Sequence, residues 1–166
     1  NSFKRDRSQQ ELFVRERKNF KLPELKTNLL ENTFDELEIL GFPLSNPFLL
    51  LLEAPWSKLL ASDFPRFLNK FISIYGYLVA RKSTSASGNK RMAFGTFLDQ
   101  KGYFIDTVHF PREVEAYPFR GKGVYLLSGK VVEEFGFYSL EVQRMEKMAF
   151  VPDPRYSMEE NVKKTG

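Results

Sequence analysis

The sequence predicts a mainly β domain with α appendages: a small five-stranded barrel preceded by short helices. Three observations predict this fold class. Apolar and aromatic residues form five strand-like runs after residue 70, turn-forming residues separate the runs, and short amphipathic helical patterns precede them. With 166 residues and 42% apolar content, the chain can bury one ordinary core. We therefore expect one folded domain with appendages.

The two ends of the chain are expected to lie outside that domain. Residues 1–32 are polar and mixed in charge, so we interpret them as a linker. The chain opens without a Met or a signal-peptide pattern, which suggests an excised fragment. Residues 149–166 are expected to form a flexible tail. No run approaches the roughly 20 apolar residues of a membrane-spanning helix, so we expect a soluble protein.

Two short helices are predicted before the strands. Thr33 and Glu36 have the spacing of a capping box, which predicts a helix that begins there and ends at Gly41. Asn46 followed by Pro47 predicts the capped start of a second helix, and the apolar run after it must be buried. The short helical segment 33–69 is therefore expected to pack on the barrel or on a missing upstream domain.

The order of the later elements predicts a particular barrel. A small-residue stretch, 83–89, is typical of a mobile loop between the first two strands, and Pro111 opens a short helix between the third and fourth. Three strands, a helical connector and two more strands form the topology of the OB-fold, a Greek-key barrel. Residues 70–148 are expected to form this domain, with strands at 71–80, 92–98, 103–110, 124–132 and 137–148.

Composition excludes several kinds of chemistry. The chain has no cysteine and one histidine, so disulfides, thiolate catalysis and Cys/His zinc sites are excluded. No phosphate-binding loop or nucleophile elbow is present either. We expect a fragment with no catalytic residues, no metal and no cofactor. A chain without thiols fits a reducing compartment, and we expect a cytoplasmic location.

Charge and aromatic content concentrate in the predicted barrel. Residues 70–148 carry 12 basic and 8 acidic side chains, which accounts for the whole net charge of +4, and 14 of the 25 aromatic residues. Cations beside flat aromatic rings suit a strand of phosphates and bases. The alternative is ordinary surface charge on an aromatic-rich core.

Four cations flank the predicted loop between the first two strands. An antiparallel hairpin would bring them to one rim of the barrel, where they could neutralise phosphates. Nearby aromatic rings offer stacking surfaces, although about half must fill the core and alternation alone does not settle which. The cations are Arg81, Lys82, Lys90 and Arg91, and the aromatic residues are Phe94, Phe97, Tyr103 and Phe104.

His109, in the third predicted strand, is the remaining candidate for this binding site. Its ring could stack on a base, but a partly buried strand histidine is the commoner case. The candidate residues for nucleic-acid binding are Arg81, Lys82, Lys90, Arg91, Phe94, Tyr103 and His109.

Three stretches carry a family resemblance. They are residues 36–47, the set Gly76, Arg81-Lys82, Met92-Ala93-Phe94, Leu98-Asp99 and Gly102, and the two strand ends Val108-His109-Phe110-Pro111 and 127–131. Their order and spacing over residues 33–148 resemble the C-terminal region of the bacterial DNA polymerase III alpha subunit, with its OB-fold domain and preceding helical segment. The spacing from Gly102 to Phe110 is one residue longer than in that family, which predicts a bulge in the third strand.

The resemblance implies a non-catalytic module of a DNA-directed DNA polymerase that guides single-stranded template DNA. The family's catalytic acids lie in an upstream domain that this chain lacks. Other polymerase domains and replisome proteins would be its partners, with no membrane involved. Two alternatives stay open: a structural or protein-interaction module of the replisome, and an RNA-binding OB domain.

Overall fold

Five strands close into a barrel in the order β1-β2-β3-β5-β4, with β4 pairing back onto β1. The computed structural model describes residues 28–86 and 90–157. Every strand pair is antiparallel except β3 with β5. This order confirms the predicted OB-fold. The strands are β1 Phe71–Ala86, β2 Lys90–Leu98, β3 Phe104–His109, β4 Val124–Glu134 and β5 Phe137–Lys147.

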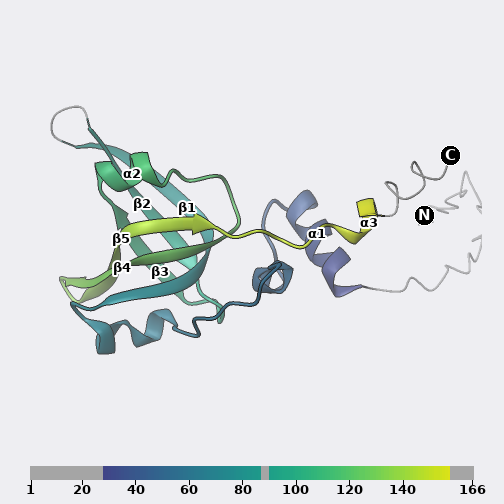
Figure 1. The fold of residues 1–166 in the computed structure, drawn as a ribbon, viewed down its shortest axis with the longest axis horizontal. Helices are drawn as coiled ribbons and strands as arrows, with labels where there is room; N and C mark the ends of the chain where they lie inside the picture. Colours follow the sequence, from purple (N-terminus) through teal and green to yellow (C-terminus); the bar gives the residue numbers. More distant parts are fainter. Residues whose placement is uncertain (1–27, 87–89, 158–166) are drawn as a thin grey trace, which may run out of the picture.

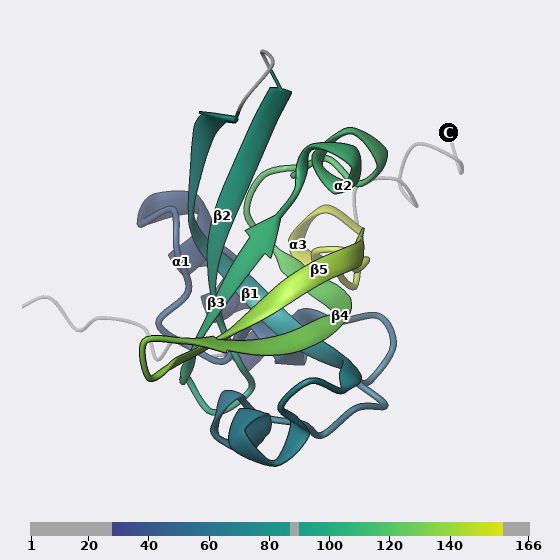
Figure 2. The same cartoon turned by 90° about the vertical axis from the view of Figure 1, so that its left-hand side faces the viewer.

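Short helices lie around the barrel. Figure 1 shows α1 and α3 side by side, at one side of the barrel. Figure 2 shows α2 near one end of the barrel and the η2 turns near the other. The predicted connector helix at Pro111 is confirmed as α2. The helices are α1 Leu29–Ile39, η1 Pro47–Leu50, η2 Ala61–Phe67, α2 Pro111–Ala116 and α3 Pro154–Ser157.

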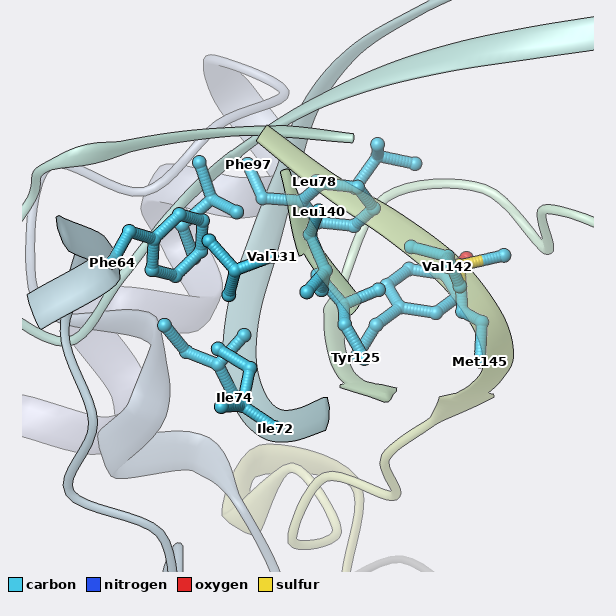
Figure 3. Packing of buried hydrophobic residues seen from close by; sticks show 12 residues of the cluster. Phe64, Ile72, Ile74, Leu78, Phe97, Tyr125, Val131, Leu140, Val142 and Met145 are labelled. Carbon is cyan, nitrogen blue, oxygen red and sulfur yellow. The ribbon is translucent and has the colours of Figure 1, made fainter. Parts of the chain in front are cut away.

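The core fills the inside of the barrel with side chains from all five strands (Figure 3). Phe97 is completely buried, and its ring lies edge-on to Tyr125 with centroids 5.9 Å apart. Phe64 of η2 belongs to the same cluster, and Phe119, after α2, packs against it. Burial of this apolar surface is the main stabilising contribution to a small barrel.

Glycines inside the strands allow close approaches that the barrel requires. A Cβ at Gly129 would lie 2.1 Å from the backbone oxygen of Glu141, beside a register shift in the β4–β5 ladder. A Cβ at Gly95 would lie 2.7 Å from both Phe97 and Thr107. Both distances are shorter than real Cβ contacts allow, so glycine is required for the coiling of these strands.

The first hairpin is longer than predicted. Residues 83–86 pair with residues 90–93, so much of the expected mobile loop belongs to β1, and residues 87–89 lie outside the described residues. Small polar residues can form this ladder because their backbone N–H and C=O groups pair across the strands even when their side chains do not pack in a core. The bulge predicted in the third strand is wrong, because β3 pairs with β2 without a shift. The shift in this region occurs at Val79 in β1.

The predicted capping box is also wrong. Helix α1 begins four residues earlier, with the Asn28 side chain accepting from the backbone N–H of Leu30. Thr33 is therefore inside the helix, and its hydroxyl donates to the Leu29 carbonyl oxygen. The linker predicted for residues 1–32 thus loses its last four residues to α1, and residues 1–27 lie outside the described part. The predicted end is confirmed, since Gly41 follows the helix with φ of +73°.

Segment 33–69 packs on the outside of the barrel through a second apolar cluster. Phe48 and Leu51 are buried there against Tyr75 and Tyr77 of β1. The Asn46 side chain caps η1 as predicted, accepting from the Phe48 N–H at 3.0 Å.

The end of the chain returns to this same segment. Leu51 and Phe150 form a β-bridge, and the Val151 N–H donates to the Leu50 carbonyl oxygen. Arg155 forms ion pairs with Asp35 and Glu38 of α1. The prediction of a flexible tail from residue 149 is therefore wrong up to residue 157, because backbone pairing and a charge cluster hold this stretch. Residues 158–166 lie outside the described part.

Candidate nucleic-acid interface

The outer face of β2 and β3 carries two exposed aromatic rings. Phe94 pairs with Val108 and Leu98 pairs with Phe104, so Phe94 and Phe104 share this face. Phe94 is 42% exposed and Phe104 is 65% exposed. Four residues of an extended strand separate Phe94 from Leu98, about 13 Å. The rings thus stand at the two ends of one short surface.

Alternation along the strands explains why these rings face outward. Ala93 and Phe97 on β2 point into the barrel, as do their partners His109 and Ile105 on β3. Successive side chains of a strand point to opposite faces, so burying this set exposes Phe94 and Phe104. Of the four rings named from the sequence, only Phe97 is in the core.

All four predicted cations lie on the β1–β2 hairpin, and the three whose side chains are described lie on two faces of it. Lys82 pairs with Phe94, which places it on the outer aromatic face. Arg81 pairs with Gly95 and Arg91 pairs with Ser85, which places both on the inner side. Lys90 pairs with Ala86 at the hairpin end, beyond the residues whose side chains are described. The strand register thus brings the cations to one hairpin and divides them between its faces.

The hairpin extends past the rest of the barrel, so both of its faces are open. The paired ends of β1 and β2 project beyond the neighbouring strands in both views (Figures 1 and 2). Arg81, Lys82 and Arg91 are all exposed. The Arg81 guanidinium lies 5.9 Å from the centre of the Phe119 ring, a cation–π contact at the barrel mouth.

His109 lies inside the barrel and cannot touch a ligand in this structure. It is completely buried, and its ring centroid is 4.7 Å from that of Phe119. Its position opposite Ala93 on the inner face is the reason. We therefore remove His109 from the candidate interface.

The hydrogen bonds of His109 fix which ring nitrogen carries the proton. The Thr107 hydroxyl donates to the Gly95 carbonyl oxygen at 2.9 Å, so its oxygen accepts from the Nε2–H of His109 at 2.9 Å. Nδ1 is buried without a partner. Burial lowers the pKa of His109 to about 4, which keeps the ring neutral.

Tyr103 lies at the opposite end of the face from the cations. It is 54% exposed and precedes β3 in the β2–β3 turn. The Asp99 carboxylate organises this turn by accepting from the backbone N–H groups of Lys101 and Tyr103. Tyr103 is therefore beside Phe104 in the chain and remote from Lys82.

The tip of the β4–β5 hairpin carries aromatic residues that the sequence analysis did not select. Phe135 is 96% exposed and Phe137 is 79% exposed. Phe135 has φ of +53°, a left-handed conformation that favours glycine or asparagine. The detectable signal was an aromatic residue directly before Gly136 in a tight turn, where small polar residues are usual.

Acidic groups also lie on the outer face. Asp106 pairs with Thr96 between the two exposed rings, and its carboxylate accepts from the Thr96 hydroxyl at 3.1 Å. This carboxylate would repel a phosphate close to it. The outer face is therefore aromatic with mixed charge. The projecting hairpin adds positive charge to it through Lys82.

The described residues, 28–86 and 90–157, hold no candidate metal site and no candidate membrane-spanning helix. They contain no group of three or more His, Asp or Glu residues placed to hold a metal ion. None of the described helices has the length and apolar character needed to cross a membrane.

Comparisons with known proteins add little. No family model matches the chain, and no curated protein matches it. Solved structures that are similar include the second OB-fold domain of replication protein A from Methanococcus maripaludis (15% identity, TM-score 0.37). The match covers 48% of this chain and 85% of the replication protein A chain.

Two further solved structures are similar to the same degree. One is the mitochondrial single-stranded DNA binding protein Rim1 from S. cerevisiae, with 11% identity and a TM-score of 0.40. The match covers 49% of this chain and 94% of that chain. The other is the S. pombe Stn1-Ten1 complex, with 18% identity and a TM-score of 0.41. The match covers 66% of this chain and 88% of that chain. At these values the likenesses carry no argument about function, and the OB-fold assignment depends on strand order and closure.

Proposed function

We propose that the outer face of β2 and β3 binds single-stranded nucleic acid, with DNA as the natural ligand. One observation carries the proposal: Phe94 and Phe104 are exposed on one face of the sheet, with Lys82 beside Phe94. Exposed rings can stack on bases of any sequence, and lysine or arginine can neutralise the phosphates between them. The module itself carries out no chemistry in this proposal.

The positions of Lys82, Phe94 and Phe104 suggest the path of the nucleic-acid strand. The backbone would enter along the projecting hairpin past Lys82 and cross Phe94 and then Phe104. The exposed rings of Phe135 and Phe137 at the β4–β5 tip would extend the stacking surface beyond Phe104, because β5 runs parallel beside β3. A bulky residue held at positive φ costs roughly 1–3 kcal/mol, and such strain concentrates at functional sites. This supports a binding role for the tip.

The resemblance of residues 33–148 supports a finer proposal. In it, the chain is part of a replicative DNA polymerase alpha subunit and guides the template toward an active site on another domain. A cytoplasmic location and contacts with other replisome proteins would follow from that role. Binding independent of base sequence is expected, because a template must pass whatever its sequence.

The aromatic rings provide the direct test. Anisotropy titration of the full chain with labelled oligothymidine should give saturable binding, and Phe94→Ala and Phe104→Ala should each weaken it by about 1–3 kcal/mol. Phe71→Ala is the matched control, because Phe71 is 58% exposed on β1 away from this face. Equal affinity for all three variants and the unchanged chain would refute the site. Tighter binding of oligouridine than oligothymidine would favour the RNA alternative.

Salt dependence tests the cations separately. Each phosphate contact that is lost should reduce the slope of log affinity against log salt by about 0.7. The combined substitution of Arg81, Lys82, Lys90 and Arg91 by alanine should therefore flatten the slope measurably. An unchanged slope would remove the hairpin from the interface.

A further inference from the structure

A cavity of about 490 Å³ lies between the helical segment and the barrel. Its walls come from four parts of the chain: residues 42–48, residues 77–79 of β1, residues 98–102 at the end of β2 and in the β2–β3 turn, and Lys122. This side cavity is within the range of roughly 300–1,000 Å³ that ligand sites occupy. Nothing in the proposed nucleic-acid path uses it.

Specific contacts hold the outer wall of the side cavity in place. The Glu36 carboxylate accepts from the backbone N–H groups of Leu44 and Ser45 at 2.8 and 2.7 Å, and from the Ser45 hydroxyl. The Ser45 backbone hydrogen bond in particular lowers the pKa of Glu36. On the other side, the Lys122 ammonium donates to the Gly41 carbonyl oxygen. The loop is therefore fixed at both ends.

The lining is apolar and partly open to solvent. Leu44 is 72% exposed, Phe42 is 49% exposed, and Val79 reaches the cavity from the bulge in β1. Tyr77 also lines it, and its buried hydroxyl has no hydrogen-bond partner. An unpaired buried hydroxyl is uncommon and costs about 1–3 kcal/mol.

More cations than carboxylates line the side cavity. Lys101 and Lys122 both line it. Asp99 is the one carboxylate among the lining residues, and it accepts from three backbone N–H groups, those of Ala61, Lys101 and Tyr103. The lysines therefore have no free carboxylate partner within the lining, and an acidic ligand would complement them.

We propose that the side cavity binds a short acidic segment of a partner protein. One bulky apolar side chain enters the cavity, and neighbouring carboxylates lie near Lys101 and Lys122. A partner larger than a free small molecule is favoured because exposed apolar residues continue along the chain before Phe42, at Leu40 and at Ile39, the last residue of α1. Nucleic acid is disfavoured because the lining offers only the two cations Lys101 and Lys122, and the Asp99 carboxylate would repel a phosphate.

The side cavity and the nucleic-acid face are neighbours but separate. Leu98 lines the cavity and pairs with Phe104 on the outer face. The peptide proposal does not depend on nucleic-acid binding, and either can fail alone. The same titrations with peptide and with oligothymidine distinguish the two failures.

The test uses the full chain and a labelled peptide of sequence Glu-Asp-Glu-Asp-Phe-Leu. Two control peptides replace all acids by Lys, or Phe and Leu by Ser. Leu44→Asp and Lys101→Glu should each lower the affinity for the acidic peptide about tenfold. Leu52→Asp is the matched control for Leu44→Asp, because Leu52 is 60% exposed and does not line the cavity.

Amide shifts in ¹⁵N spectra locate the bound peptide. The proposal is supported if shifts concentrate at residues 42–48, 77–79 and 98–102, the control peptides bind at least tenfold more weakly, and Leu52→Asp binds as the unchanged chain does. It is overturned by absence of saturable binding, by equal binding of the Lys peptide, or by shifts centred on Phe94. It is also overturned if oligothymidine, and not the peptide, shifts the cavity residues.

Discussion

The two faces of β2 use aromatic residues for opposite purposes. Phe97 on the inner face is completely buried and contacts Tyr125 and Phe119. Phe94 on the outer face is 42% exposed, three positions earlier in the same strand. Their neighbours differ accordingly, because Gly95 leaves room for the inner ring whereas Lys82 lies beside the outer one. An odd spacing along one strand is enough to separate a core residue from a candidate contact residue.

Strand β3 shows the same division between its two faces. Ile105, Thr107 and His109 fill the barrel, whereas Phe104, Asp106 and Val108 alternate with them on the outside. The inner set is constrained by packing, and the outer set is free to meet a ligand. Substitutions on the two faces should therefore separate stability from binding.

The largest effect is expected on the inner face. Phe97→Ala should destabilise the fold by about 3–5 kcal/mol, because it removes a fully buried ring and leaves a cavity. Phe94→Ala should cost less than about 1 kcal/mol, since that ring is partly solvated. Urea unfolding followed by circular dichroism measures both. Equal losses would mean that the outer ring also belongs to the core.

The strand order could be predicted from the sequence, but the facing of individual side chains could not. Five apolar runs with a helical connector at Pro111 determine the topology. The face of His109 depends on register, and register depends on bulges. The shifts at Val79 and in the β4–β5 ladder leave no clear mark in composition. The sequence therefore left two roles open for His109, a base-stacking role and the commoner role of a partly buried strand residue.

Long-range contacts account for the other differences. The spacing of Thr33 and Glu36 satisfies a capping box, but Glu36 instead reaches forward to Ser45. The charged end of the chain has the composition of a tail, but Arg155 pairs with Asp35 and Glu38, more than 100 residues earlier. Local patterns cannot show a partner that only the folded chain brings near. The sequence predicted that the cations lie on one hairpin. Their division between the two faces of that hairpin depends on the strand register, which the sequence does not show.

The next largest effect concerns pH and again belongs to the inner face. The folded-state pKa of His109 is about 4, below its ordinary value of 6.5. The unfolded chain therefore binds a proton more readily as pH falls. The resulting stabilisation is complete above pH 6.5 and decreases toward pH 4, a loss of about 3 kcal/mol. Urea unfolding at several pH values measures it.

His109→Gln isolates this contribution from that of the carboxyl groups. A glutamine amide can still donate to the Thr107 hydroxyl but does not titrate. The difference in unfolding free energy between the two proteins should therefore change by about 3 kcal/mol between pH 7 and pH 4. A difference that stays constant with pH would show that the histidine ring reaches solvent, and the inner and outer faces would then not be distinct at this position.

The smallest effect is expected at Asp106, which is exposed on the outer face between Phe94 and Phe104. Asp106→Asn removes a negative charge close to the proposed path of the phosphates but keeps an acceptor for the Thr96 hydroxyl. Oligothymidine affinity should rise by about 0.5–1 kcal/mol at low salt, with a smaller gain at high salt because mobile ions screen the repulsion. Glu53→Gln, an exposed acid in the helical segment, is the control and should leave affinity unchanged. If Asp106→Asn also leaves affinity unchanged at low salt, the nucleic acid does not pass between the two rings, and the exposed aromatic residues of this face have another purpose.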